Sequence, residues 1–359
     1  MRRYHPLRIE RVERAAADAV RVALAVPQEL EETFRFLPGQ HLPVQATIGG
    51  RIERRTYSIC SPPGVLPLEI GVRVQPGGVF SGHVERLAAG DTLDAMPPFG
   101  RFHAKLDPEA SRTCVAFAAG SGITPILSIV RATLETERAS RFILFYGNRS
   151  QRTTMFVDEL YALKNRFPER LQLFFVFSRE EQEFPLFGGR LDAGKVRELY
   201  ARFCAELEPD AAFICGPDTM IDTVRGVLEA QGLPAAAIHT ERYGVPRKRA
   251  EAAATVAPPP ARASAHLADV TVIMDGHRKT FAMTTGDPNV VDAAAEHGIE
   301  LPYSCKGGVC ATCRTFLREG RVRMATNYAL EDWEVEKGFV LACQSRPLTP
   351  TVVLDYDEI

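Results

Sequence analysis

Four cysteines near the C-terminus constrain the fold of this chain more than any other feature. Three of them, Cys305, Cys310 and Cys313, are separated by four and then by two residues, and the fourth, Cys343, follows after a long gap. Two glycines lie inside the first interval, where the absence of a side chain lets a loop curl tightly. The fold must therefore bring a tight loop and a distant segment together around one small centre.

This spacing is the plant-type pattern of thiolate ligands to a 2Fe-2S cluster. We therefore predict Cys305, Cys310, Cys313 and Cys343 as metal ligands. Backbone N–H groups of the glycine-containing loop can point at the sulfur atoms and help to set the reduction potential. The apolar run 339–342 is typical of a buried strand, which would return the fourth ligand to the loop.

Two other uses of the cysteines stay open from the spacing alone. A structural zinc site normally takes two short-spaced pairs of ligands, whereas here one cysteine stands alone. A disulfide needs an oxidising compartment, and the charged residues after Met1 do not form a secretory signal. We therefore expect a reduced, cytoplasmic location, in which Cys60, Cys114 and Cys204 are small apolar core residues.

Length and composition indicate a globular protein of two or three domains. The chain has 359 residues, of which 45% are hydrophobic and 25% charged. It contains no uninterrupted apolar run long enough to span a bilayer. We expect neither a membrane-inserted segment nor a nucleic-acid partner.

A linker is predicted at residues 247–265, because alanines and the run Pro258-Pro259-Pro260 show no apolar period. It separates a C-terminal cysteine-containing domain, 266–359, which carries a net charge of −5, from a body that carries +3. This asymmetry could help the two parts to dock. Two ordinary solvated surfaces would explain it equally well.

The body divides into two regions of different rhythm. Residues 1–107 contain short apolar or alternating runs punctuated by glycine and proline, which predicts an antiparallel β-barrel. Residues 108–246 alternate strand-like and helix-like segments, which predicts an α/β domain with a doubly wound parallel sheet. Such sheets bind ligands beyond the carboxyl ends of their strands.

Three segments at predicted strand ends of the α/β region have the composition of nucleotide sites. Gly120-Ser121-Gly122-Ile123-Thr124-Pro125 could cradle a phosphate, with Thr124 capping a helix that begins at Pro125. Ser178 and Arg179 suit an adenosine 2′-phosphate, because arginine offers a planar fork to phosphate oxygens. Cys215 precedes a Gly-Pro turn. Each segment alone could equally be an ordinary turn or a solvated strand end.

Two segments of the barrel region are candidates for a second cofactor. In Arg55-Thr56-Tyr57-Ser58, Arg55 and Tyr57 share one face of a strand, so a ring could lie on a planar group while the guanidinium holds its phosphate. The loop containing Gly78 and Ser81 could open a short helix that forms another anion cradle. A surface strand and a hairpin turn are the alternatives.

Taken in this order, the motifs closely resemble the ferredoxin–NADP reductase superfamily. The C-terminal plant-type ferredoxin, which would have the α+β β-grasp fold, narrows the resemblance to reductase components such as that of phenylacetyl-CoA epoxidase. These feed electrons to diiron or Rieske oxygenases. The resemblance extends over residues 5 to 355.

The resemblance implies a role for each motif residue. The flavin would be bound by Arg55, Tyr57 and Ser58, its ring would be approached by the backbone of Val72 and Val74, and a pyrophosphate, which favours FAD over FMN, would be held by Gly78 and Ser81. The nicotinamide nucleotide would be contacted by Gly120, Gly122 and Thr124, and NADPH would be selected by Ser178 and Arg179. Cys215 would lie near the nicotinamide and Tyr243 near the flavin. Among these, Tyr57, Ser58 and Cys215 would be the catalytic residues.

The implied activity is electron transfer from NADPH to FAD, then to the 2Fe-2S cluster, then to an oxygenase component, with phenylacetyl-CoA epoxidase in phenylacetate catabolism as the first candidate. A Rieske ring-hydroxylating oxygenase, a desaturase or a hybrid-cluster protein are alternative acceptors, and a non-catalytic redox-sensing module is an alternative of another class. Lys306 and Arg314, next to the ligands, could contact an acidic partner or be plain exposed charges.

Overall fold

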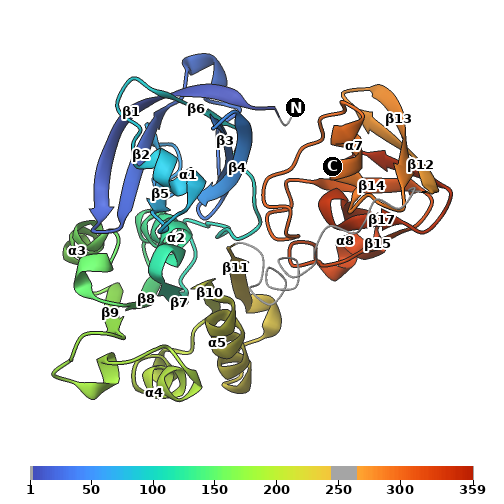
Figure 1. Cartoon of the computed structure of the whole chain (residues 1–359). Helices are drawn as coiled ribbons and strands as arrows, with labels where there is room; N and C mark the ends of the chain where they lie inside the picture. Colours follow the sequence, from blue (N-terminus) through green and yellow to red (C-terminus); the bar gives the residue numbers. More distant parts are fainter. Residues whose placement is uncertain (1–2, 244–264, 359) are drawn as a thin grey trace. The chain divides into compact units, whose positions relative to one another are not determined.

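A computed structural model describes residues 3–243 and 265–358 (Figure 1). The chain divides into two compact units, which we call the N-terminal unit, Tyr4–Arg242, and the C-terminal unit, here residues 265–358. Apart from residue 265, the predicted linker lies outside the described residues.

A six-stranded antiparallel sheet, in the order β4-β3-β6-β1-β2-β5, forms the first half of the N-terminal unit. An isolated bridge between Ile59 and Ile70 brings the two outer strands together, so the sheet closes into the predicted barrel. Alternate side chains such as Leu42 and Val44 point into its core, which Phe80 and Val84 of α1 also enter. The elements are β1 (His5–Ala16), β2 (Ala19–Ala25), β3 (His41–Ile48), β4 (Arg51–Ser58), β5 (Leu68–Arg73), α1 (Val79–Val84) and β6 (Thr92–Ala95).

The second half is the predicted doubly wound sheet, with five parallel strands in the order β11-β10-β7-β8-β9. The strand order reverses between β7 and β10, and ligands bind at such switch points. The elements are β7 (Thr113–Ala119), α2 (Ile123–Thr136), β8 (Arg141–Asn148), α3 (Val157–Arg166), β9 (Leu171–Phe177), α4 (Ala193–Phe203), β10 (Ala211–Gly216), α5 (Asp218–Ala230) and β11 (Ile238–Arg242).

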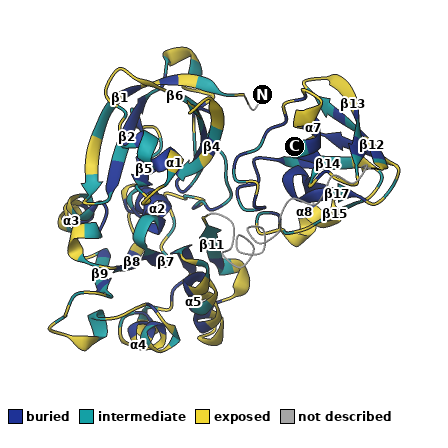
Figure 2. Cartoon of the chain, viewed as in Figure 1, coloured by how far each residue is buried: buried dark blue, intermediate teal, exposed yellow. Residues whose placement is uncertain are grey.

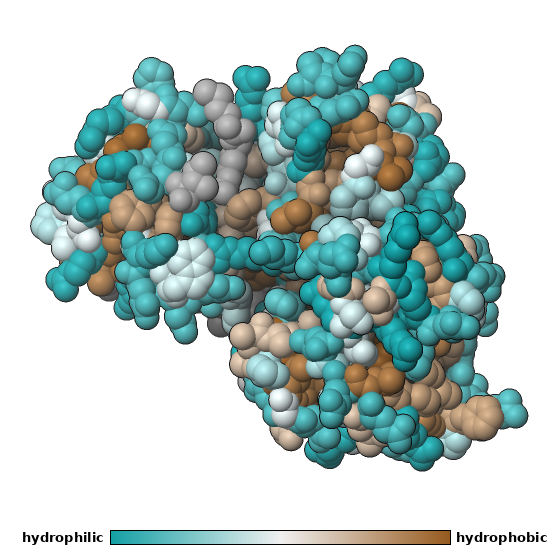
Figure 3. All heavy atoms as spheres, turned by 180° about the vertical axis from the view of Figure 1, so that it is seen from behind, coloured by the Kyte–Doolittle hydropathy of each residue, from teal (hydrophilic) through white to brown (hydrophobic). Residues whose placement is uncertain are grey.

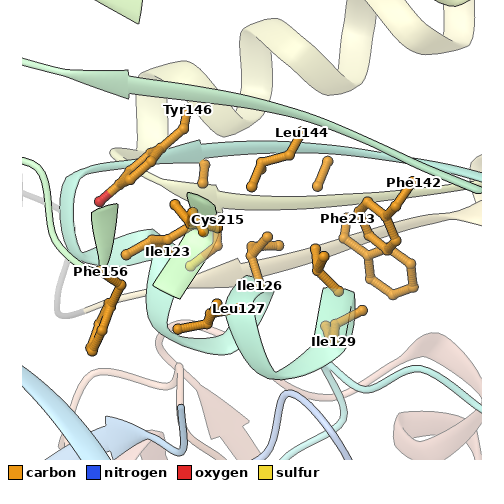
Figure 4. Packing of buried hydrophobic residues seen from close by; sticks show 14 of the residues in the cluster. Ile123, Ile126, Leu127, Ile129, Phe142, Leu144, Tyr146, Phe156, Phe213 and Cys215 are labelled. Atoms are coloured by element: carbon orange, nitrogen blue, oxygen red, sulfur yellow. The ribbon is translucent and has the colours of Figure 1, made fainter. Parts of the chain in front are cut away.

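Two separate apolar clusters pack helices on both faces of this sheet. One contains α2 and α3 residues and the other contains α4 and α5 residues. Figure 4 shows Ile123 and Ile126 of α2 directed at the strands that carry Leu144 and Phe213. Exposed residues cover the outer sides of α4 and α5 (Figure 2).

The barrel and the α/β half contact each other closely. The Ser128 hydroxyl on α2 donates to the Ser61 carbonyl at 2.9 Å, and Arg21 of β2 pairs with Glu159 of α3 at 2.6 Å. A Cβ atom at Gly39 of the barrel region would lie 2.9 Å from Ile129 Cδ1 of α2, so the two halves are in direct contact there. Sites that draw residues from both halves are therefore held in one packed body.

The C-terminal unit has the predicted α+β architecture. Its main sheet has the order β13-β12-β18-β14-β16, with β12 and β18 parallel and the other pairs antiparallel, and β15 and β17 form a second sheet. The elements are β12 (His266–Met274), β13 (His277–Thr284), α7 (Val290–Glu296), β14 (Arg314–Glu319), β15 (Val322–Met324), α8 (Asp332–Glu336), β16 (Phe339–Leu341), β17 (Ser345–Pro347) and β18 (Thr351–Asp355).

The surface is mixed in character. Figure 3 shows hydrophilic residues interspersed with apolar ones on the face opposite to that of Figure 1. Within the described residues, no helix is both long enough and apolar enough to cross a bilayer.

Candidate functional site: two cofactor centres and a nucleotide edge

The four predicted ligand cysteines come together in two pairs. The Cys310 thiol hydrogen bonds to Cys305, which lowers the pKa of Cys305 and raises that of Cys310. The same relation holds between Cys313 and Cys343, with the pKa of Cys343 lowered and that of Cys313 raised. β16, buried along its whole length as predicted, delivers Cys343 to the loop.

Backbone geometry prepares the loop for negatively charged sulfur. The N–H groups of Gly307 and Cys310 donate to Cys305 Sγ at 3.3 and 3.4 Å. Lys306 and Ala311 adopt positive φ values of 49° and 52°, which residues other than glycine rarely adopt. Strained backbone of this kind concentrates at functional sites, where the surroundings hold it in place.

The paired arrangement fits a 2Fe-2S cluster, because each of its two irons takes two of the four thiolates. A structural zinc ion would need four ligands around one point, and the described residues contain no group of three or more such side chains close enough to hold one metal ion. All eight cysteines are free thiols. The donor set therefore suits the cluster better than zinc or a disulfide.

Arg314 does not lie on the surface as an exposed charge. Its side chain is 10% exposed, pairs with the fully buried Glu334 at 2.8 Å and lies over the Phe339 ring. That part of the prediction is wrong, because β14 turns the residue into the domain. Lys306 pairs with Asp292 and lies over the Tyr303 ring.

The glycine loop lies at the switch point of the parallel sheet. Gly120–Gly122 form one 3-10 turn between β7 and α2. A Cβ atom on Gly122 would lie 2.1 Å from the Cys215 carbonyl oxygen, so the loop packs directly on the end of β10. Two motifs that are distant in sequence thus share one edge.

The expected capping role of Thr124 is wrong. Helix α2 begins at Ile123, with Gly122 as its N-cap, so Thr124 lies inside the first turn. Its hydroxyl donates to the Ser121 carbonyl at 3.0 Å and its side chain is buried. The 3-10 turn continues directly into the helix, which moves the helix start ahead of Pro125.

Arg73 of β5 reaches this loop from the barrel, and sequence analysis missed it. Its guanidinium pairs with Asp18 and donates to the Thr153 carbonyl, and its Nε lies 4.0 Å from the position of a Cβ on Gly120. Gly120 has a φ of +57° and its carbonyl accepts from the Tyr146 hydroxyl at 2.9 Å. A fixed cation therefore stands beside the loop that we interpret as a phosphate cradle.

The barrel motif and the start of α1 form a second cradle. Arg55 lies over the Phe80 ring at 5.9 Å, and Tyr57 lies 6.0 Å from the same ring. Burial raises the pKa of Tyr57 to about 12, so its phenol stays neutral at ordinary pH. The predicted short helix is α1; Gly78 is its N-cap, and a Cβ on Gly78 would lie 2.6 Å from Ser81 Oγ.

A carboxylate from the α/β half joins this centre, and no sequence pattern pointed to it. Glu241 of β11 accepts a hydrogen bond from the Ser58 hydroxyl at 3.1 Å, and its other oxygen lies 3.3 Å from His41 Nδ1. His41 and Ser58 are direct partners across β3 and β4, so their side chains share a face. The Glu241 and His41 side chains are 10% and 8% exposed.

The 2′-phosphate candidates follow β9 at the edge of the sheet. Ser178 and Arg179 continue the pairing of β9 with β8, because their N–H groups donate to the carbonyls of Asn148 and Arg149 at 2.9 Å. Two exposed arginines, Arg149 and Arg179, thus leave neighbouring strand ends together. Within the described ranges, neither forms an ion pair with a carboxylate.

The other predicted residues have diverse surroundings. Val72 is fully buried in the barrel core and Val74 pairs with Asp18 through its N–H. The Cys215 side chain is fully buried beneath α2 (Figure 4), while its backbone lines the switch point. The Tyr243 side chain is 38% exposed.

A cavity of about 590 Å³ between α1, β3 and β6 is lined by none of the predicted site residues.

Three family models match the chain in the same order as these parts. An oxidoreductase FAD-binding domain matches residues 6–104, an oxidoreductase NAD-binding domain matches 117–226, and a 2Fe-2S iron-sulfur cluster binding domain matches 272–348. The start of α1, the glycine loop before α2 and the paired cysteines each fall inside one of the matched ranges.

Relatives and solved structures agree with this division. The chain is 42% identical to a component of the 1,2-phenylacetyl-CoA epoxidase from Escherichia coli (strain K12), over 99% of each chain. It is 30% identical to the ferredoxin reductase component of 3-ketosteroid-9-alpha-monooxygenase from Rhodococcus rhodochrous, over 98% of this chain and 96% of that one.

The fold is also similar to that of phthalate dioxygenase reductase, described as a modular structure for electron transfer from pyridine nucleotides to 2Fe-2S. That similarity has a TM-score of 0.57 at 23% identity and covers 98% of each chain. The chain therefore belongs to the family of ferredoxin reductase-type oxidoreductases that join an FAD-binding barrel, an NAD-binding α/β domain and a 2Fe-2S ferredoxin domain in one polypeptide.

Proposed function

We propose that the protein is the cytoplasmic, NADPH-dependent reductase component of a phenylacetyl-CoA epoxidase. It would pass electrons from NADPH through FAD and the 2Fe-2S cluster to a diiron oxygenase component. The observation that carries this proposal is the 42% identity, over 99% of both chains, to a component of that epoxidase. The relatives named for other oxygenases are about 30% identical.

The cofactor set explains why three parts are needed. A nicotinamide gives up two electrons as hydride, a plant-type cluster accepts one at a time, and a bound flavin converts between the two. The task of the protein is to bind and orient these groups. The barrel and the α/β half form one packed body, which suits a hydride transfer that depends on alignment.

In the barrel, we assign the flavin phosphates to Arg55 and to the N–H groups at the start of α1, near Gly78 and Ser81. Arg55 and Phe80 are neighbours, so side chain and helix end converge on one place. Tyr57 would lie along the flavin ring, with the backbone at Val72 and Val74 beside it. A neutral Tyr57 adds a flat face without adding charge.

At the hydride-transfer centre, we assign Ser58 to the flavin edge and Glu241 to holding its hydroxyl. Glu241 accepts a hydrogen bond from the Ser58 hydroxyl and lies against His41, so residues from both halves of the unit fix the orientation of this hydroxyl. Cys215 would act through its position at the end of β10, against which Gly122 packs. Tyr243 remains a candidate for the flavin face.

For the nucleotide, we assign Gly120, Gly122 and the first turn of α2, which contains Thr124, to the pyrophosphate. We assign Ser178 and Arg179 to the 2′-phosphate and add Arg149 to that pair. Two guanidinium groups on neighbouring strand ends, without ion pairs in the part of the chain that the structure describes, match the charge of a phosphate monoester, which supports NADPH over NADH.

Reconstitution tests the proposal. The purified reductase, loaded with FAD and cluster, is mixed with NADPH and the candidate diiron oxygenase component, and epoxidation of phenylacetyl-CoA is measured. A Rieske oxygenase component serves as the competing acceptor. Faster electron transfer to the Rieske component would overturn the partner assignment, and no NADPH oxidation with either acceptor, cytochrome c or ferricyanide would overturn the enzymatic role.

A further inference from the structure

Gln344, directly after the distant ligand Cys343, connects that ligand to the three-cysteine loop. Its side-chain Nε2 donates to the Lys306 carbonyl at 2.8 Å and to the Cys343 carbonyl at 3.0 Å, and it lies 3.5 Å from Cys343 Sγ. The residue is 7% exposed. One buried amide thus connects the segment of the distant ligand to Lys306, which lies 38 positions earlier in the chain.

The orientation of this amide follows from its neighbours. Two of them are carbonyl oxygens, and the third is a sulfur that is a thiolate whenever it binds iron. All three are acceptors, so the NH₂ group and not the amide oxygen must face them. Nε2 carries two hydrogens for these three acceptors, so the N–H that points at Cys343 is shared between its carbonyl oxygen and its sulfur, and through this shared bond the amide is a donor to the ligand sulfur.

Gln344 is also held firmly by its surroundings. Its main-chain carbonyl accepts from the Ala325 N–H at 2.9 Å. A Cβ on Gly308 would lie 3.1 Å from Gln344 Cγ and 2.8 Å from the Thr326 carbonyl oxygen, so the ligand loop packs on the glutamine stem. A packed side chain loses little further freedom when the cluster binds, which makes its hydrogen bonds effective.

We propose that Gln344 is a positioning residue of the cluster, which holds Cys343 against the Cys305 side of the loop and raises the reduction potential through its hydrogen bond to Cys343 Sγ. This inference rests on the cluster assignment within the proposed function. Reduction adds negative charge to the cluster and its sulfur ligands, and a donor that points at a sulfur stabilises the reduced form. The Lys306 carbonyl, in its left-handed backbone conformation, is fixed by the same amide.

Thr312 offers a comparison that separates the two effects. Its hydroxyl lies 3.1 Å from Cys310 Sγ and must be the donor when that sulfur is a thiolate. This contact stays within the three-cysteine loop, whereas Gln344 also reaches the Lys306 carbonyl, 38 positions away in the chain. Loss of the Thr312 hydroxyl should change the potential without loosening Cys343.

The test uses the full-length, cluster-loaded protein and the variant Gln344→Leu, with Thr312→Val for comparison. The control is Ser345→Ala, which removes a buried hydroxyl bonded to the Leu341 carbonyl at 2.9 Å. Redox titration is followed by the EPR signal of the reduced cluster, and iron release to a chelator is timed on the same samples.

At the wild-type midpoint, we expect the ratio of reduced to oxidised cluster in Gln344→Leu to fall roughly threefold to tenfold, which is about 30 to 59 mV for a one-electron couple. The ratio of reduced to oxidised cluster should fall similarly in Thr312→Val, and in Ser345→Ala it should equal that of the wild type. Iron release should be faster only in Gln344→Leu. An unchanged potential at full cluster occupancy would overturn the inference, whereas a wild-type protein that binds no cluster would overturn the proposed function instead.

A measurement on the wild-type protein covers the case in which Gln344→Leu does not load. Protein made by cell-free synthesis with ¹⁵N only in the glutamine side-chain amide is reduced and studied by pulsed EPR. A nitrogen coupling from that amide to the cluster is expected. Its absence would count against a hydrogen bond to the ligand sulfur.

Discussion

The two units build their centres in opposite ways. In the C-terminal unit, three of four ligands come from one nine-residue stretch, and nearby hydrogen bonds hold them. In the N-terminal unit, the centre takes residues from the barrel, from the switch point of the sheet and from β11, which is separated from Ser58 by 183 positions. The first centre is local and the second is an assembly of long-range contacts.

This difference determines how each centre should fail. A local centre depends on the identity of a few atoms, so one substitution removes it and leaves the rest of the molecule intact. An assembled centre depends on packing between elements, so a substitution changes geometry and its effects are graded. The following predictions test this contrast, from the largest expected effect to the smallest.

Cys313→Ser should abolish the cluster. Cytochrome c reduction, which needs single electrons from the cluster, should fall more than about 100-fold, while ferricyanide reduction by the flavin should stay within about twofold. Cys204→Ala is the control, since Cys204 is buried in the α/β core and is no ligand. Equal loss of both activities would show that the cluster is not the last carrier.

Gly122→Ala should disturb the assembled centre most. Its Cβ would need to lie 2.1 Å from the Cys215 carbonyl oxygen, so the loop must move away from β10. Because misplacement by about 1 Å can cost about 100-fold, we expect flavin reduction by NADPH to slow by that order in stopped-flow measurements. Gly226→Ala in α5, where no neighbour lies within 4 Å, should be neutral or slightly stabilising.

Glu241→Gln keeps an acceptor for Ser58 and removes the charge beside His41. We expect flavin reduction by NADPH to slow about tenfold, with little change in NADPH affinity, because the carboxylate orients a group at the reacting centre. Glu229→Gln, on the exposed side of α5, is the control. A purely affinity-based effect would contradict the assigned role of Glu241.

Arg179→Ala should have the smallest effect. Arg179 is exposed, and an exposed charge pair contributes about 1 kcal/mol or less, so KM for NADPH should rise by about fivefold while KM for NADH stays constant. Arg149→Ala should act in the same direction, and Arg202→Ala on α4 should not. If both coenzymes respond equally, these arginines do not contact the 2′-phosphate.

The amino-acid sequence predicted the local centre better than the assembled one. The cysteine spacing led directly to the ligand set, and the run pattern with its glycine and proline punctuation located most strands of the N-terminal unit and the start of α1, but only β16 of the C-terminal unit. It missed β1, whose buried Leu7 and Ile9 alternate with charged residues. It also placed the start of α2 at Pro125, because the 3-10 turn that continues into the helix leaves no mark in the composition.

The roles of Glu241, His41 and Arg73 could not be predicted from local patterns. Each is an unremarkable residue within a strand, and its neighbours at the site are set by the packing of the barrel on the α/β half. Such contacts become visible only when strand order and register are known. The resemblance to a family supplied the cofactors, but the carboxylate that joins the two halves came from the structure.

The outer position of β9 in the parallel sheet has a consequence for redesign. Arg149 and Arg179 project from an edge of the sheet, whereas Gly122 lies at its centre against the Cys215 carbonyl, where a Cβ atom does not fit. Under the proposed assignment of these arginines to the 2′-phosphate, we expect surface substitutions to exchange the coenzyme preference and to leave the hydride-transfer geometry untouched. An NADH-driven version of this reductase should be reachable with a handful of changes around β9, without rebuilding the interior.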